Sequence, residues 1–205
     1  MNPVPYMETL RRIAADMGPQ RGFQASLKAL LALLAERHGF LRPHLVIFDP
    51  ETRTLRLCVA GGAPRSEQVV YEPGMGVTGQ VFVTGKPVIV ECLKGHPVFL
   101  SKFFVRTEEE LSSLAFLSVP VLAPQAGWEA GREQARKVIG VLSLDTPCAP
   151  REVLEQHRCF LEVVAGMIAA QAAYLQDDMA RQQRLAERRG ERPHVAGNLD
   201  GGIVA

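Results

Sequence analysis

The sequence lacks a clear excess of charge of either sign. Among 205 residues, Lys and Arg total 23 and Asp and Glu total 22, which leaves a formal net charge of +1. A chain that binds nucleic acid over a broad surface usually carries a clear basic excess. The charge balance therefore disfavours nucleic-acid binding by this part of the protein.

Long apolar runs are also missing. A helix that spans a bilayer needs about 18 continuous apolar residues or more. The most apolar run, residues 27–35, contains Lys28 and is followed by Glu36 and Arg37. The first residues, MNPVPYMETLRR, lack the apolar core of a signal peptide. We therefore expect a cytoplasmic protein that does not contact a membrane.

Cysteines are few and widely spaced. Cys58, Cys92, Cys148 and Cys159 include no C-x-x-C pair and no short Cys/His spacing. This argues against a structural zinc site, and in a reducing compartment against a disulfide framework. The spacing predicts buried small side chains or surface thiols, and no metal site.

Sequence motifs for catalysis are scarce. No G-x-S-x-G, H-E-x-x-H or Walker sequence occurs, and no two histidines are spaced i, i+4. Gly74-x-Gly-x-x-Gly79 matches the dinucleotide fingerprint, but Gly85 and Pro87 end the following helix after about five residues, too early for a crossover to a parallel strand. We interpret these glycines as a tight turn with close backbone packing. No catalytic residue, cofactor or enzymatic activity is predicted.

Hydrophobic periodicity predicts the order of elements. Leu27, Leu30, Leu31 and Leu34 form one apolar stripe of a helix over 23–37. Strands are predicted at 44–48, 55–60, 69–71, 88–90, 115–122 and 137–145, with a short helix at 80–84 and an irregular segment at 91–110. Strands in the middle and helices at both ends indicate an α+β fold, whose mainly antiparallel sheet is covered by the terminal helices.

A long helix is predicted to begin near Pro150, a favoured first-turn residue. Its apolar stripe is too wide for the seam of a two-stranded coiled coil, so it fits a helix that packs on a sheet and keeps apolar surface for a second helix. We expect a homodimer, with Phe160, Met167 and Tyr174 at the interface. The predicted organisation is an extension at 1–22, a domain at 23–176, and a polar helical extension and linker at 177–205.

Several segments resemble the GAF domain family. Residues 71–90, YEPGMGVTGQVFVTGKPVIV, resemble its central signature, and FLSVPVL (116–122) and VIGVLSLD (138–145) resemble its last two core strands. HPVFL (96–100) resembles a segment of a narrower group, the amino-terminal sensors of Nif-specific regulatory proteins, which activate nitrogen-fixation genes. RPHVAGN (192–198) resembles the linker that leads into their AAA+ ATPase module.

The resemblance implies a pocket between the sheet and residues 93–107, here called the lid segment. It also implies a sensing role in which a small effector, such as 2-oxoglutarate, gates the ATPase module. In the full-length regulators, DNA and sigma-54 RNA polymerase are contacted through domains absent here, and an inhibitory protein is a further partner. The candidate ligand-binding residues are Phe99, Lys102, Phe103, Arg106, Ser118 and Ser143. In the alternative interpretation, the aromatic residues of the lid segment close the core and its cations face water.

Other members of the family suggest different functions. The N-K-x-F-D-E pattern of cyclic-nucleotide GAF domains is absent, which disfavours cyclic GMP or AMP as ligand. Free methionine sulfoxide reductases carry a cysteine in the glycine-rich loop, where this chain has Thr78. A thiol redox enzyme using Cys92 or Cys58 remains the enzymatic alternative, and a pure dimerisation module is the structural one.

Overall fold

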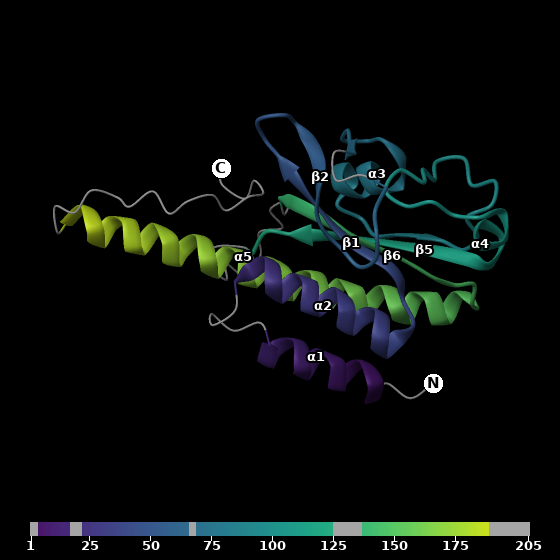
Figure 1. Ribbon diagram of the computed structural model, residues 1–205, viewed down its shortest axis with the longest axis horizontal. Coiled ribbons are helices and arrows are strands. Elements are labelled where there is room, and N and C mark those ends of the chain that lie inside the picture. Colours follow the sequence, from purple (N-terminus) through teal and green to yellow (C-terminus); the bar gives the residue numbers. More distant parts are fainter. Residues whose placement is uncertain (1–3, 17–21, 66–68, 125–136, 189–205) are drawn as a thin grey trace, which may run out of the picture.

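The computed structural model describes residues 4–16, 22–65, 69–124 and 137–188 (Figure 1). The elements follow in this order: α1 (Val4–Asp16), α2 (Phe23–His38), β1 (Leu41–Asp49), β2 (Thr54–Ala60), β3 (Val70–Tyr71), α3 (Gly76–Thr84), β4 (Val88–Val90), α4 (Glu108–Ser113), β5 (Leu114–Leu122), β6 (Val138–Pro147) and α5 (Arg151–Arg188). The predicted α+β class is confirmed.

A six-stranded sheet has the order β3-β2-β1-β6-β5-β4, and every neighbouring pair is antiparallel. The predicted hairpin joins β1 to β2 through a turn in which the Asp49 carboxylate accepts the backbone N–H of Glu51. The chain then returns so that β6 lies between β1 and β5. This brings the first and last long strands together at the centre of the sheet.

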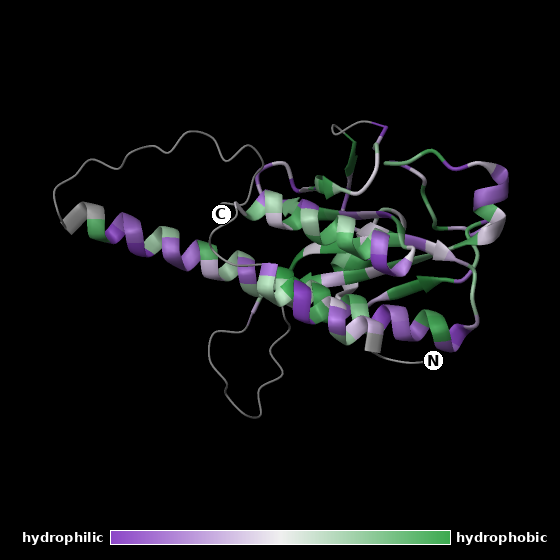
Figure 2. Cartoon of the chain, turned by 60° about the horizontal axis from the view of Figure 1, so that its bottom comes forward, coloured by the Kyte–Doolittle hydropathy of each residue, from purple (hydrophilic) through white to green (hydrophobic). Residues whose placement is uncertain are grey.

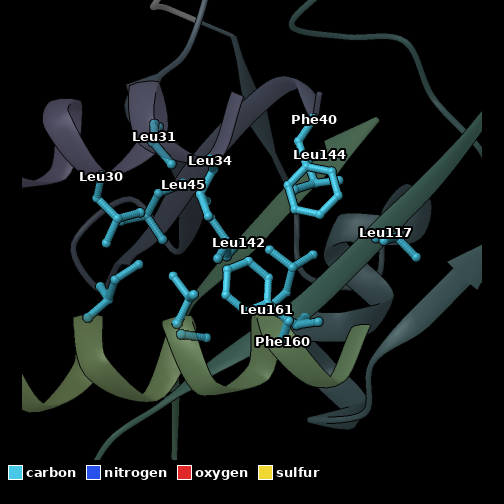
Figure 3. Close-up of a cluster of buried hydrophobic side chains, with 14 of the residues drawn as sticks. Leu30, Leu31, Leu34, Phe40, Leu45, Leu117, Leu142, Leu144, Phe160 and Leu161 are labelled. Carbon is cyan, nitrogen blue, oxygen red and sulfur yellow. The ribbon is translucent and has the colours of Figure 1, made fainter. Parts of the chain in front are cut away.

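Helices α1, α2 and α5 cover one face of the sheet (Figure 1). The predicted stripe of α2 is buried, and Figure 3 shows Leu30, Leu31 and Leu34 pointing toward side chains of the sheet and of α5. From α5, Leu161 reaches into the same core and is fully buried. This apolar layer is where most of the hydrophobic burial of the fold takes place.

Helix α1 was not predicted, because residues 1–22 were interpreted as an extension. Its stripe of Tyr6, Leu10 and Ile13 packs onto the core of the helical face, and Ile13 is 2% exposed. The Tyr6 ring stacks on His38 of α2 with 5.0 Å between centroids. The stripe covers only two turns, which is why periodicity alone did not identify it.

The opposite face of the sheet is covered by α3 and the lid segment, and α4 lies at one end of the sheet (Figure 1). Helix α3 begins at Gly76, earlier than the predicted Gln80, so half of the glycine-rich loop is helical. Gly74 and Gly76 have positive φ angles, and a Cβ on Gly79 would lie 2.6 Å from the Glu72 carbonyl oxygen. The glycines thus provide the predicted tight turn and close packing.

Helix α4 lies within the segment expected to be irregular. The Thr107 side chain accepts the Glu110 N–H, and the Glu110 carboxylate accepts the Thr107 N–H, which makes a reciprocal capping box. This capping box satisfies two backbone N–H groups at the start of the helix, which otherwise have no partner within it, and so supports a helix of only six residues.

Helix α5 has 38 residues, so at 1.5 Å per residue it is about 57 Å long and continues beyond the sheet (Figure 1). Hydrophilic residues are frequent in the projecting end (Figure 2). By length and composition alone, α5 is the one described helix that could span a membrane. It nevertheless contains no stretch of about 18 continuous apolar residues. Its apolar residues Leu154, Leu161 and Ile168 pack against the sheet, which accounts for the apolar character of that part of α5.

Candidate functional site

The lid segment and the sheet enclose a cluster of buried polar groups. Arg106 of the lid segment donates two parallel hydrogen bonds to Asp145 of β6, from Nε to Oδ2 at 2.9 Å and from Nη2 to Oδ1 at 3.0 Å. The side chains of Arg106 and Asp145 are 3% and 0% exposed. A bidentate pair of this geometry is among the stronger polar contacts in proteins.

The same carboxylate binds a second arginine. Arg42 of β1 donates from Nε to Asp145 Oδ2 at 2.6 Å and from Nη1 to Glu110 Oε1 at 2.6 Å. Arg42 has a φ angle of +49°, a left-handed backbone conformation that residues other than glycine rarely adopt. The hydrogen bond from Arg42, together with that from the Thr107 N–H, lowers the pKa of Glu110. One network therefore joins β1, β6, the lid segment and α4.

A neutral histidine lies beside this network. His44 of β1 is 3% exposed, and its Nδ1 lies 2.9 Å from the Arg42 carbonyl oxygen, so Nδ1 carries the proton and donates. Burial lowers the pKa of His44 to about 4, and the nearby Asp145 carboxylate only partly offsets this effect. The imidazole edge packs against Phe103 of the lid segment, with 5.6 Å between ring centroids.

Lys102 holds the other side of the lid segment. Its Nζ donates to the Val70 carbonyl oxygen at 3.1 Å and lies 5.1 Å from the centre of the Tyr71 ring. The Tyr71 hydroxyl donates to the Leu100 carbonyl oxygen at 3.1 Å. Burial raises the pKa of Tyr71 to about 12, so the phenol remains protonated in solution near neutral pH.

The six predicted ligand-binding residues all lie on this side of the sheet. Phe103 is buried, Phe99 lies over the Arg106 guanidinium at 5.0 Å, and the Ser118 and Ser143 hydroxyls are hydrogen-bonded at 2.9 Å in the sheet beneath. The two serines lie in the row of the sheet that contains His44, because His44 pairs with Ser143 and Ser143 pairs with Ser118.

In this conformation the lid segment is closely packed. The space lined by His44, Tyr71, Lys102 and Arg106, with neighbouring side chains, is about 10 Å³, whereas one water molecule needs about 10–15 Å³. Phe103 and Phe104 are 2% and 3% exposed, so the lid aromatics do close the core here. The cations, however, do not face water as the alternative interpretation expected.

A larger hollow, of about 260 Å³, lies on the helical face of the sheet. It is lined mainly by apolar side chains of β1, β6 and α5, including Ile47, Val138 and Ala169. Residues 124 and 137 border it, and those between them lie outside the described structure. The predicted pocket and this hollow are on opposite sides of the sheet.

The predicted dimer residues differ in their surroundings. Phe160 is 5% exposed and packs against Tyr6, 4.7 Å between ring centroids, so it belongs to the core of the protomer. Met167 is half-buried, and Tyr174 is 54% exposed. The heptad row curves around α5 because 3.6 residues per turn do not divide seven evenly. Only the later part of the row is therefore free for a contact between protomers.

The cysteines proposed for a redox enzyme lie away from the lid cavity. Cys58 packs against the core of the helical face, and burial raises its pKa to about 11. Cys92 is exposed at the start of the lid segment. Thr78, at the position of the missing reductase cysteine, is 2% exposed in α3. This arrangement disfavours Cys58 as a thiolate nucleophile.

Five groups of the site were not predicted: Arg42, His44, Tyr71, Glu110 and Asp145. Ser143 and Asp145 alternate with Leu142 and Leu144 in a strand that is otherwise mainly apolar, and His44 interrupts the apolar strand β1. Polar residues at every second position of a central strand were therefore a usable signal, because they mark one face of the sheet.

Comparisons with known proteins give a consistent picture. A sequence model of the family described as GAF domain matches residues 8–172. The chain is 27% identical over 177 residues to a Nif-specific regulatory protein of Azotobacter vinelandii, covering 82% of this chain and 31% of that protein. It is 26% identical over 200 residues to nitrogen fixation protein VnfA of the same organism, covering 92% of this chain and 35% of that protein. The chain thus spans about a third of the length of these curated relatives.

Solved structures share the fold. The A. aeolicus nlh2 GAF domain, solved in an inactive state, has a TM-score of 0.67 at 21% identity, and the match covers 82% of this chain and 95% of that one. A free methionine-R-sulfoxide reductase of Neisseria meningitidis, solved with its substrate, has a TM-score of 0.62 at 21% identity, covering 81% and 87%. At these identities the likeness concerns the fold alone.

Proposed function

Because this chain belongs to the GAF domain family, we propose that it is a regulatory, non-enzymatic sensor domain of a cytoplasmic nitrogen-fixation activator. The names of the curated relatives support the regulatory role, as does the fold. In this proposal a small anionic effector binds under the lid segment, and its presence alters the arrangement of α5, which leads toward an ATPase module that acts with DNA and sigma-54 RNA polymerase. A homodimer through the exposed side of α5 and an inhibitory partner protein belong to the same proposal.

The observation that carries the proposal is the buried Arg106–Asp145 pair. A guanidinium that is 3% exposed sits between a lid and a sheet, where it already binds a carboxylate. The carboxylate of an effector such as 2-oxoglutarate also offers two oxygens to Arg106. An effector that takes the place of Asp145 as the partner of Arg106 therefore conserves the charge-assisted hydrogen bonds. Asp145 would keep its second partner, Arg42, during that exchange.

The packed cavity requires the lid segment to move. A space of about 10 Å³ does not hold a dicarboxylate, so the described conformation is closed and an effector would bind an open one. When only a fraction of the protein is open, the apparent affinity falls by that fraction. An effector changes the balance only as far as it binds the open form better, about 1.4 kcal/mol for each factor of ten.

The position of Asp145 suggests how binding would reach α5. Asp145 lies in β6, six residues before Arg151, the first residue of α5. Glu91, just after β4, binds Arg151 Nη1 at 2.8 Å, which connects the start of the lid segment to the same helix. Movement of the lid segment would therefore act on the beginning of α5 from two sides.

Calorimetry with millimolar 2-oxoglutarate tests the proposal. We expect measurable heat and a thermal shift for the wild type, and a several-fold weaker affinity for Arg106→Lys, which keeps the charge but loses the bidentate fork. Lys94→Gln is the matched control, because it removes an exposed cation from the same segment. Absence of both heat and thermal shift removes 2-oxoglutarate as the effector, and equal binding by Arg106→Lys places the ligand away from the lid cavity.

A further inference from the structure

Two exposed cysteines lie at one end of the sheet. Cys92 follows the last residue of β4 by two positions, and Cys148 directly follows β6. Strands β4 and β6 are both antiparallel to β5 and flank it, so both end near the start of β5, where Val90 pairs with Phe116 and Pro147 pairs with Leu114. The lid segment begins immediately after Cys92, and α5 begins three residues after Cys148.

Hydrogen bonds bring the two thiols toward each other. The Cys148 N–H donates to the Ser113 carbonyl oxygen at 2.9 Å, and the Cys148 thiol donates to the Glu91 carbonyl oxygen at 3.3 Å. Glu91 precedes Cys92, so the Cys148 side chain reaches across the end of β5 to the peptide bond that joins Glu91 to Cys92. The Cys92 thiol lies 3.8 Å from the Leu111 carbonyl oxygen, a weak contact that a side-chain rotation can release.

Two further observations agree with this proximity. The ion pair of Arg151 with Glu91 connects the same two segments at 2.8 Å. Partial burial and the neighbouring Cys92 thiol both raise the pKa of Cys148. The ion pair uses the Glu91 side chain and the hydrogen bond uses the Glu91 backbone carbonyl, and both place the two segments side by side.

We infer that Cys92 and Cys148 are a redox-sensitive pair that closes into a reversible intramolecular disulfide and ties the start of the lid segment to the start of α5. Strands that flank a common neighbour are about 9–10 Å apart, and a disulfide spans Cα atoms up to about 7 Å apart. Both cysteines lie beyond the paired residues of their strands, so the bond draws the two strand ends together. Such a strained disulfide is easily reduced, as suits a regulatory bond.

The oxidant is a small aliphatic disulfide, which reacts by two successive thiol–disulfide exchanges. The Cys92 thiolate attacks one sulfur of the oxidant, which forms a mixed disulfide and releases one thiol. The Cys148 thiolate then attacks the Cys92 sulfur of that mixed disulfide and releases the second thiol. The two protein thiols are oxidised, the oxidant is reduced to two thiols, and the protons lost from the cysteines go to the thiolates that leave. A raised pKa reduces the thiolate fraction of Cys148, so we assign the first attack to the exposed Cys92 and the second to Cys148.

Thiol counting after treatment with oxidised glutathione tests the inference. The reduced chain has four free cysteines, and we expect the denatured, oxidised chain to show two fewer reactive thiols. A non-reducing digest analysed by mass spectrometry should contain the Cys92 peptide joined to the Cys148 peptide. Reduction with dithiothreitol should restore all four thiols, and the oxidised form should resist proteolysis within residues 93–107 more than the reduced form.

Variants separate this pair from the other cysteines. Cys159→Ser is the matched control, because it removes an exposed cysteine of α5 and should leave the loss of two thiols unchanged. Cys92→Ser and Cys148→Ser should each abolish the linked peptides. Unchanged thiol counts, glutathione adducts without a linked peptide, or a disulfide between two copies of the chain would each overturn the inference. None of these results depends on whether an effector binds under the lid segment.

Discussion

Along strands β5 and β6, alternate residues face the helices and the lid segment, and the two faces bury different groups. On the helical face Leu117, Leu142 and Leu144 continue an apolar core. On the lid face Ser118, Ser143 and Asp145 are equally buried, at 0% exposure. Burying polar groups is costly unless each finds a partner. The helical face is therefore apolar, whereas the lid face combines an apolar cluster with a polar network whose closure depends on several segments at once.

The largest expected effect concerns Asp145. Replacing it in Asp145→Ala leaves Arg42 and Arg106 without their shared carboxylate, and breaking a buried ion pair in this way costs about 3–5 kcal/mol. Urea unfolding measures the loss. We also expect faster proteolysis within the lid segment under native conditions, because Arg106 no longer holds it to β6.

The matched control is the preceding residue, which points to the other face. Leu144 is fully buried among the helices, so Leu144→Ala should cost about 2–5 kcal/mol through the cavity it leaves. Without urea, under native conditions, Leu144→Ala should leave the rate of proteolysis within the lid segment unchanged. If both variants open the lid segment equally, or if Asp145→Ala costs less than about 1 kcal/mol, the distinction between the two faces is wrong.

The lid face contains a buried group that should make the fold sensitive to acid. His44 is buried and neutral, with a pKa lowered from 6.5 to about 4. The unfolded chain binds a proton that the folded chain does not over this range, so this histidine lowers stability as pH falls from 6.5 toward 4. This destabilisation is absent above the unfolded pKa, grows as pH falls, and reaches about 3 kcal/mol at pH 4 and below.

Urea unfolding of the wild type and of His44→Gln between pH 7 and pH 4 measures this term. Gln can still donate to the Arg42 carbonyl oxygen but does not titrate, so the stability of the wild type should fall more steeply than that of the variant. His38→Gln is the comparison on the helical face, where burial lowers the pKa of His38 as well. Parallel pH profiles for the wild type and His44→Gln would contradict a buried neutral His44.

Sequence patterns predicted the fold more completely than the site. Strand alternation and the leucine stripe of α2 placed most elements, because these patterns are local. The lid residues Phe103 and Arg106 were selected through the family resemblance and from their residue types. Asp145, the partner of Arg106, was not selected, because it lies 39 residues away in the sequence. Arg42, the second partner of Asp145, is 103 residues from it. Pairs of this kind depend on sheet topology, which periodicity does not report.

The smallest expected effects compare glycines on the two sides. In Gly79→Ala of α3, the new Cβ would lie 2.6 Å from the Glu72 carbonyl oxygen and 2.9 Å from the Gly74 nitrogen. Backbone atoms do not yield as a flexible side chain does, so we expect a loss of about 1–3 kcal/mol. In Gly166→Ala of α5, no described atom outside the adjacent residues and the backbone of the helix itself lies within 4 Å of the new Cβ, and a gain of about 0.5–1 kcal/mol follows from the better helix propensity.

Thermal or urea unfolding of both variants decides whether α3 and α5 differ as described. The gain at Gly166 applies to a helix surface that no other described residue covers, and Gly166 is exposed beside Met167. A stability gain at both low and high protein concentration would therefore indicate that this turn of α5 stays open in any dimer. A loss that grows with concentration would instead show that a second copy packs closely there, which would move the proposed interface toward the amino-terminal half of α5, away from Tyr174.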